Sequence, residues 1–141
     1  GAVVNGFVSG FGYSGSMAIA SSVAHDSHHM IVVGTNHEMM ASAANRLGEV
    51  GGGVTLWKDG SEVALVELPI AGLMSDIEAS EVALKTQNIV QAMTDCGCNL
   101  NNAYMQHTLL ALVVIPELRI SDLGLVDVNR FELTKVISSK P

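Results

Sequence analysis

The stretch MAIASSVAHDSHHMIVV, residues 17–33, decides the fold of this chain, because two short apolar runs flank a polar centre. The runs Met17 to Val23 and Met30 to Val33 are short and contain β-branched residues, which favours buried strands over helices. Between them, Ala24 to His29 holds three of the five histidines. Each buried unpaired polar group costs about 1 to 3 kcal/mol, so this segment needs hydrogen-bond partners or a cleft that ligands reach.

Three interpretations of this polar segment are open. In the first, Asp26 and Ser27 cap their own backbone, and the segment is a hydrogen-bonded turn. In the second, the side chains of His25, Asp26, Ser27 and His28 line a ligand pocket. In the third, the histidines bind a metal ion, but the sequence offers no second cluster of ligands to complete a coordination shell. The sequence therefore assigns candidate pocket-lining residues, and neither a catalytic residue nor a metal ligand.

Length and charge exclude several classes of function. The 141 residues fit one domain that spans residues 1–141. The formal net charge is −7 with only 7 Lys and Arg and no basic run, which argues against nucleic acid or a membrane surface as a partner. No apolar run approaches the roughly 20 residues that span a bilayer, and the sequence does not begin with the pattern of a signal peptide.

The composition also predicts a partner surface and a cellular compartment. With 48% hydrophobic and only 15% charged residues, the chain has little charge to cover a small solitary domain. Cys96 and Cys98 stand one residue apart, which is too close for an easy disulfide, and no second pair completes a zinc site. We expect reduced thiols in a cytoplasmic protein.

Local signals predict two helices. Asn36 is a good N-cap for a helix from His37 to Val50, whose apolar residues recur at three- and four-residue spacing. The glycines 51–53 end this helix. Ser75 and Glu78 form a capping box, which predicts a second helix of some twenty residues that ends at Gly97.

The strands follow from apolar runs and turn signals. Asp59-Gly60 is the strongest hairpin signal in the chain. The loop Pro69 to Met74 is apolar, which predicts that it packs on something. Residues 138–141 are expected to fray. The expected strands are 2–8, 17–23, 30–33, 54–58, 62–68, 108–115 and 123–128. The sum is an α+β fold, a layered single domain with a mixed sheet of six to seven strands and two main helices.

Five blocks of this sequence resemble the C-terminal domain of bacterial and archaeal adenine deaminases, and they occur in that domain's order. They cover nearly the whole chain, which makes the resemblance specific. Where the family pattern has Asn after the second histidine, this chain has His29. The blocks are Ser21 to His28 with Ile31 to Asn36, Gly51 to Gly53, Leu68 to Ser75, Ile115 to Leu118, and Gly124 to Val128.

The resemblance implies a parent enzyme of the metal-dependent amidohydrolase superfamily, which hydrolyses adenine to hypoxanthine and ammonia in purine salvage. In that superfamily a barrel binds divalent metal, here manganese or iron, through a His-x-His pair, two further histidines and an aspartate. This chain has no His-x-His, and eight strand–helix units do not fit in 141 residues. The chain is therefore expected to be a C-terminal piece that packs on the barrel, needs no cofactor of its own and is inactive alone.

The resemblance also implies a role for the polar segment. His25, Asp26, Ser27 and His28 would border the adenine pocket, where an imidazole could relay protons while Asp26 fixes its tautomer. Two other classes of function stay open. One is a structural or oligomerisation domain whose apolar loop is a subunit interface, and the other is a small-ligand binding module that works alone. A homo-oligomer is expected.

Overall fold

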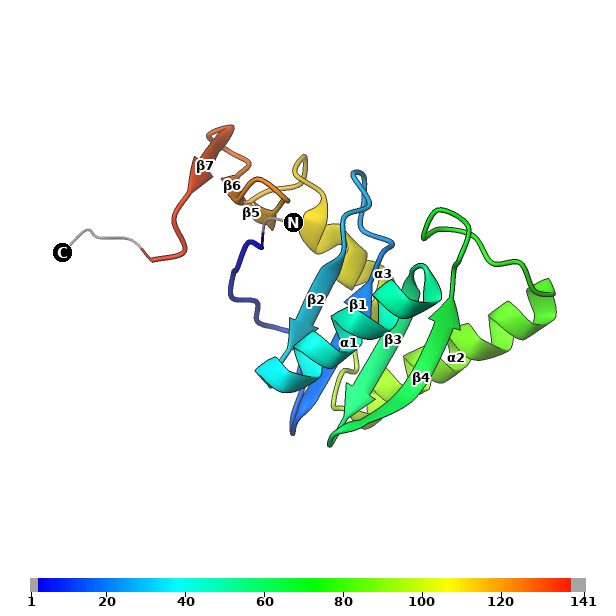
Figure 1. The fold of residues 1–141 in the computed structure, drawn as a ribbon. Helices are drawn as coiled ribbons and strands as arrows, with labels where there is room; N and C mark the ends of the chain where they lie inside the picture. Colours follow the sequence, from blue (N-terminus) through cyan, green and yellow to red (C-terminus); the bar gives the residue numbers. More distant parts are fainter. Residues whose placement is uncertain (1–2, 138–141) are drawn as a thin grey trace.

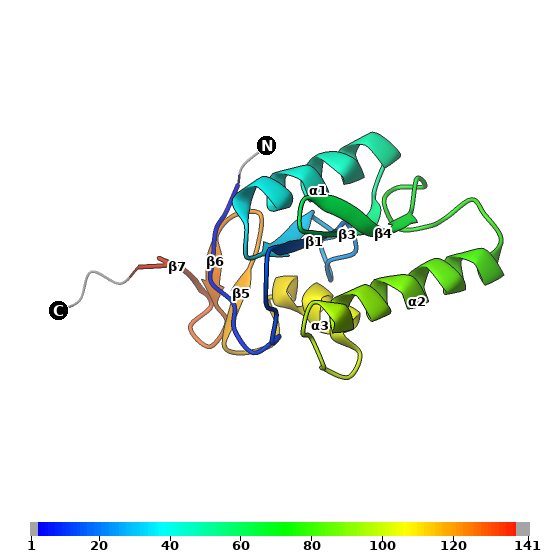
Figure 2. The ribbon, with the colours of Figure 1, turned by 90° about the horizontal axis from the view of Figure 1, so that it is seen from below.

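The chain is built around a four-stranded antiparallel sheet with the strand order β2-β1-β3-β4, in a computed structural model that describes residues 3–137. The strands are β1 (Met17–Ser21), β2 (Ile31–Gly34), β3 (Gly53–Lys58) and β4 (Ser61–Glu67). Helix α1 (His37–Val50) covers one face of this sheet, and helix α2 (Ala79–Asp95) covers the other (Figures 1 and 2). Helix α3 (Ala103–Thr108) lies beside α2 and continues into a 3₁₀ turn, η1 (Leu109–Ala111).

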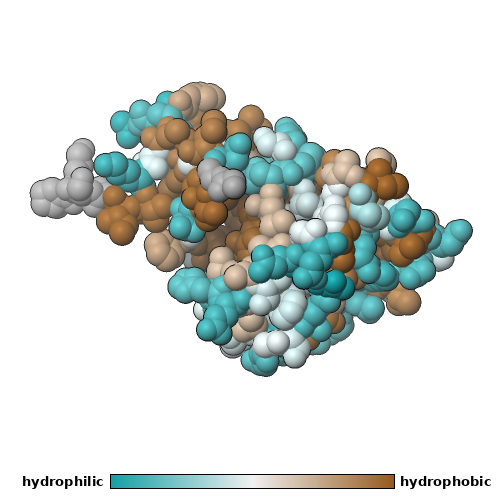
Figure 3. All heavy atoms as spheres, in the orientation of Figure 1, coloured by the Kyte–Doolittle hydropathy of each residue, from teal (hydrophilic) through white to brown (hydrophobic). Residues whose placement is uncertain are grey.

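The second sheet lies to one side of the first and has three short strands. They are β5 (Leu118–Ile120), β6 (Leu125–Asp127) and β7 (Glu132–Thr134), antiparallel in the order β5-β6-β7. The N-terminal segment runs along this sheet (Figure 2), since a Cβ placed on Gly6 would lie 3.6 Å from Ile120 Cδ1. Apolar side chains gather over this part of the surface in Figure 3.

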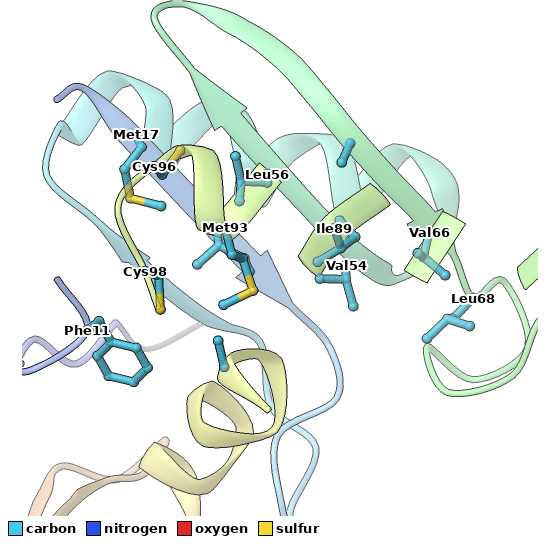
Figure 4. Close-up of a cluster of buried hydrophobic side chains, with 13 residues drawn as sticks. Phe11, Met17, Val54, Leu56, Val66, Leu68, Ile89, Met93, Cys96 and Cys98 are labelled. Carbon is cyan, nitrogen blue, oxygen red and sulfur yellow. The ribbon is translucent and has the colours of Figure 1, made fainter. Parts of the chain in front are cut away.

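The central strand β1 is buried on both faces, which explains its unbroken apolar sequence. Met17 and Ile19 point to the side of α2, while Ala18 and Ala20 point to the side of α1 and pack near Leu47. The core between the sheet and α2 holds side chains of α2 against β3 (Figure 4). Strands β1 and β2, which the stretch 17–33 forms, therefore belong to a sheet that is the middle layer between α1 and α2.

The first predicted helix and the predicted hairpin are confirmed. Helix α1 runs from His37 to Val50, and the Asn36 side chain accepts a hydrogen bond from the Met39 N–H at 3.1 Å. Gly51 ends the helix in the left-handed region, with φ of 83°. Asp59-Gly60 joins β3 to β4, and both residues have positive φ, as tight hairpin turns require.

Two predicted strands are wrong. Residues 108–115 begin at the end of α3 and pass through η1 into a turn, because a short apolar run does not distinguish a buried strand from a covered helical segment. Residues 3–8 of the predicted strand 2–8 form no strand, although they lie along the small sheet. Strands β5 and β7 are not among the predicted strands, because three residues are too short a pattern to be recognised as a strand.

The predicted capping box of Ser75 and Glu78 does not cap the start of a helix. Helix α2 begins at Ala79, and the N-cap residue Glu78 makes no side-chain cap hydrogen bond. The Ser75 Oγ is buried and has no hydrogen-bond partner among residues 3–137. The chain before it folds into a turn closed by two hydrogen bonds between the backbones of Ile70 and Met74, both at 3.1 Å, and this turn holds Ser75 away from the helix start.

The predicted α+β class is confirmed, and the part of the chain that the structure describes contains seven strands. They form two separate antiparallel sheets instead of one mixed sheet, because α3 and η1 occupy the chain where a sixth core strand was expected. The two main helices are α1 and α2, and residues 3–137 also contain the six-residue helix α3, which was not predicted. The expected fraying concerns residues 138–141, which lie outside the described residues.

Candidate functional site

Three of the five sequence blocks meet at one end of the four-stranded sheet. The hairpin loop 22–30 joins β1 to β2, the glycine turn 51–53 enters β3, and the loop 68–78 leaves β4 (Figure 1). The antiparallel register brings them together, since Ser21 pairs with both Ile31 and Val54. Segments up to fifty residues apart in sequence therefore form one edge, which we call the loop edge.

One serine side chain holds the loop edge together. The Ser22 Oγ accepts a hydrogen bond from the Gly53 N–H at 2.7 Å and donates to the Gly72 carbonyl at 2.6 Å. A Cβ placed on Gly52 would lie 2.5 Å from the Gly72 Cα, so the backbones touch. The apolar loop that contains Gly72 is thus fixed at its middle to the hairpin loop.

The hairpin loop carries the candidate residues chosen from the sequence. The Asp26 side chain is 83% exposed, the His25 side chain is 36% exposed, and His25 Nδ1 lies 3.7 Å from Asp26 Oδ1. Ser27 is also exposed. The His28 ring stands edge-on to the His25 ring at 5.3 Å, while the His28 N–H donates to the Ala24 carbonyl at 2.7 Å. His25 and Asp26 therefore face outward, whereas His28 also closes the turn.

His29 is a functional candidate that the sequence did not select. Both of its ring nitrogens are buried, and neither has a hydrogen-bond partner within the described part of the chain. Leaving buried polar atoms unpaired costs about 1 to 3 kcal/mol each. The available signal was the departure from the family pattern, which has Asn at this position.

The two best-formed cavities within residues 3–137 are not lined by the candidate histidines. An apolar cavity of about 220 Å³ opens between α2 and the sheet, and its wall includes Val23, Leu73, Thr86 and Tyr104. The Thr86 hydroxyl donates to a carbonyl of its own helix, so no free donor of this residue faces a ligand. The structure therefore brings His25, Asp26 and His28 together on one loop, and none of the three lines either of these two cavities of the described residues.

The divalent metal of the amidohydrolases does not fit the described residues. Within residues 3–137 there is no group of three His, Cys, Asp or Glu side chains placed to hold a metal ion. The same range contains no helix with the length and apolarity to cross a membrane. Cys96 and Cys98 are free and buried, and burial raises the pKa of the Cys96 thiol.

His107 occupies a buried cluster that the sequence did not predict. It lies on α3, the Tyr13 hydroxyl hydrogen-bonds its Nε2, and the Phe11 ring lies 4.4 Å from its ring. Burial lowers the pKa of His107 to about 4, so the ring is neutral near pH 7. Burial, reinforced by Cys98, raises the pKa of Tyr13. The cluster ties the N-terminal segment to α3.

Comparisons with known proteins find sequence similarity to adenine deaminases along nearly the whole chain. The family profile described as the adenine deaminase C-terminal domain matches residues 1–132. An adenine deaminase of Roseobacter denitrificans is 75% identical over 139 residues, which is 99% of this chain and 23% of that protein. One from Ruegeria pomeroyi is 76% identical over 132 residues, covering 94% of this chain and 22% of the relative. One from Moorella thermoacetica is 45% identical over 138 residues, with 98% and 23% covered. The chain thus spans about a quarter of the length of these relatives.

Proposed function

Because this chain belongs to the family of adenine deaminase C-terminal domains, we propose that it is the C-terminal part of a longer enzyme that hydrolyses adenine to hypoxanthine and ammonia. Residues 1–141 act there as a single domain that packs on a catalytic barrel, and the hairpin loop borders the adenine pocket. In this proposal the divalent metal, manganese or iron, belongs to the barrel. The enzyme is a cytoplasmic homo-oligomer of purine salvage.

The observation that carries the proposal is the outward position of His25 and Asp26 on the hairpin loop. The Asp26 side chain is exposed and the His25 side chain is partly exposed, and the carboxylate lies 3.7 Å from the imidazole, which is ion-pair distance but longer than a hydrogen bond. An imidazole gains and loses a proton near neutral pH, and a neighbouring carboxylate selects its tautomer. Such a pair suits a pocket border where the amino group of adenine leaves as ammonia, because that step needs proton transfer.

Variants of the pair test this role in a chimera in which the chain replaces the equivalent part of the Roseobacter denitrificans relative. His25→Ala and Asp26→Asn are expected to lower adenine turnover on the order of 10²-fold, as loss of a positioned proton-transfer group does. The melting temperature should change little, because the Asp26 side chain is exposed and the His25 side chain is partly exposed in this domain. Ammonia release at saturating adenine and thermal melts on the same samples measure both effects.

Two further variants are the controls. His37→Ala changes an exposed imidazole at the start of α1, at the opposite end of the sheet, and should leave turnover intact. His28→Ala should lower the unfolding free energy by about 1 kcal/mol, because the Nδ1 that faces the Ala24 N–H at 3.4 Å is lost. Normal turnover in His25→Ala, combined with a lower melting temperature, would assign the loop to structure alone.

The 141-residue chain by itself is expected to be inactive. Hydrolysis of an aromatic amine in this superfamily needs metal-activated water, and residues 3–137 offer no ligand set for the metal. Purified chain with added Mn²⁺, Fe²⁺ or Zn²⁺ should release no more ammonia from adenine than a sample without protein. Ammonia release that rises with chain concentration and stops with a chelator would contradict this expectation.

A structural or oligomerisation domain is the second candidate, and the apolar loop 69–74 favours it. Ile70, Leu73 and Met74 are 46%, 38% and 57% exposed, although Gly72 between them is buried. An exposed apolar loop is suited to a subunit interface. This candidate predicts normal turnover in His25→Ala, so the same kinetic measurement separates it from the pocket role.

A further inference from the structure

The small sheet β5–β7 has no core of its own. None of the nine residues in its three strands is buried, and every residue from Asn129 to Ile137 is exposed. Phe131 is 88% exposed and Leu133 of β7 is 59% exposed. Three strands form a stable sheet when an apolar face is covered by another layer. Within residues 3–137, that layer is incomplete.

The N-terminal segment adds further exposed apolar side chains to the same region. It covers part of the small sheet at Gly6, while Phe7 beside it is 94% exposed and Val3 is 84% exposed. Phe7 and Phe131 together expose on the order of 300 to 500 Å², since a buried aromatic side chain covers about 150 to 250 Å². This summed area is comparable to the largest apolar patch of a typical monomer. We call residues 3–8 together with β5–β7 the small-sheet face.

Charge does not explain this exposure. Residues 113–137 contain three basic and four acidic residues, whereas the whole chain carries a net charge of −7. Arg130 Nε pairs with Glu132 Oε1 at 3.1 Å, so part of this charge is already compensated. The net charge of this region is therefore close to zero, so charge repulsion does not oppose its burial against a partner, and its exposed aromatic side chains match the aromatic enrichment of protein interfaces.

The small-sheet face connects to the hairpin loop through a separate apolar cluster. Ala24 and Ile31, at the two ends of that loop, are buried with Ala111, and Leu110 and Ile120 of β5 pack against them. A partner seated on the small sheet therefore lies next to the loop that carries His25 and Asp26. Two of the five sequence blocks, 115–118 and 124–128, also overlap this sheet.

The position of the chain within its relatives points to one occupant. The chain matches 23% of the Roseobacter denitrificans relative, and its family is a C-terminal domain, so most of that relative precedes the matching part. The described N-terminal segment runs along β5 and β6 (Figure 2). A longer chain that continues into this segment would therefore approach the domain at the small-sheet face. We propose that the small-sheet face is the docking surface for the preceding, catalytic part of the longer protein. This inference rests on the proposed function, which it deepens by assigning the contact surface.

Hydrogen exchange tests the inference in the chimera and in the 141-residue chain. Amides of residues 118–134 should exchange at least about tenfold more slowly in the chimera, because docking covers the small sheet. Phe131→Glu should restore fast exchange in the chimera and leave the isolated chain unchanged, since the side chain is 88% exposed there. Leu84→Glu is the matched control on α2, where the side chain is 58% exposed, and should change neither protein.

Each outcome has a definite meaning. Equal exchange of residues 118–134 in both proteins would overturn the inference, even if the chimera hydrolyses adenine. Protection that appears in the isolated chain only at high concentration, and disappears with Phe131→Glu, would also overturn it and assign the face to a second copy. Protection in a chimera that folds but does not hydrolyse adenine would support the docking surface and overturn the proposed function instead.

Discussion

Lowering the pH from 7 to 4 is expected to reduce the unfolding free energy of this domain by about 3 kcal/mol through His107 alone. Burial lowers the pKa of this histidine to about 4, against 6.5 for the ordinary side chain. At a pH between these two pKa values, His107 is protonated more often in the unfolded chain than in the folded chain. The contribution of His107 is therefore complete above pH 6.5 and is lost as the pH falls toward 4.

The size of this effect follows from the surroundings of the ring. His107 is 2% exposed, and the Tyr13 hydroxyl hydrogen-bonded to it, whose pKa is raised by burial, stays neutral and supplies no negative charge to pair with an imidazolium. A second proton on the ring would place a cation without a negative partner in an apolar site beside Phe11. Tyr13 anchors the N-terminal segment to His107, so protonation of His107 should also loosen that segment.

Urea denaturation at pH 7, 5.5 and 4 measures this contribution. The pH dependence should become shallower in His107→Gln, although this variant starts from a lower stability at pH 7. His37→Gln is the matched control, because His37 is exposed at the start of α1. Acidic residues also titrate in this range, so the difference between variant and wild type is the quantity to compare. Equal slopes in His107→Gln and wild type would contradict the expectation.

Gly53→Ala is expected to prevent folding or to cost more than about 4 kcal/mol. Gly53 has φ of 139°, and a Cβ at this position would lie 2.0 Å from the Val66 carbonyl oxygen. The clash is with backbone, and the neighbouring pairing of β3 with β4 leaves that backbone no room to move. The hydrogen bond from Gly53 N–H to Ser22 Oγ would be lost as well, which releases the loop edge.

Gly48→Ala is the matched control on helix α1. A Cβ placed on Gly48 meets nothing within 4 Å, and the residue has an ordinary helical backbone. This change should therefore stabilise the domain by about 0.5 to 1 kcal/mol, the helix preference of Ala over Gly. Circular dichroism and urea denaturation compare the two variants. A Gly53→Ala protein within about 1 kcal/mol of wild type would contradict the close packing of the loop edge.

The candidate site was predictable in part. The sequence singled out the loop 24–29 because a run of polar residues between two apolar strands is visible without any structure. Which of its side chains face outward was not predictable, since the ends of the loop are buried in a cluster that also contains Ala111, almost ninety residues from Ala24. The unpaired nitrogens of His29 and the burial of His107 depend on tertiary contacts in the same way.

The sequence by itself determined the elements whose signals act over a few residues. Asn36 and Gly51 bound α1, and Asp59-Gly60 makes the hairpin, because a cap or a tight turn needs only its own neighbours. Five spaced blocks also determined the family. The tertiary structure alone decided that residues 103–111 are helical, that α2 begins at Ala79 and that the last strands form a separate sheet. An apolar run has no inherent choice between strand and covered helix, so the surfaces that pack against it determine which one forms.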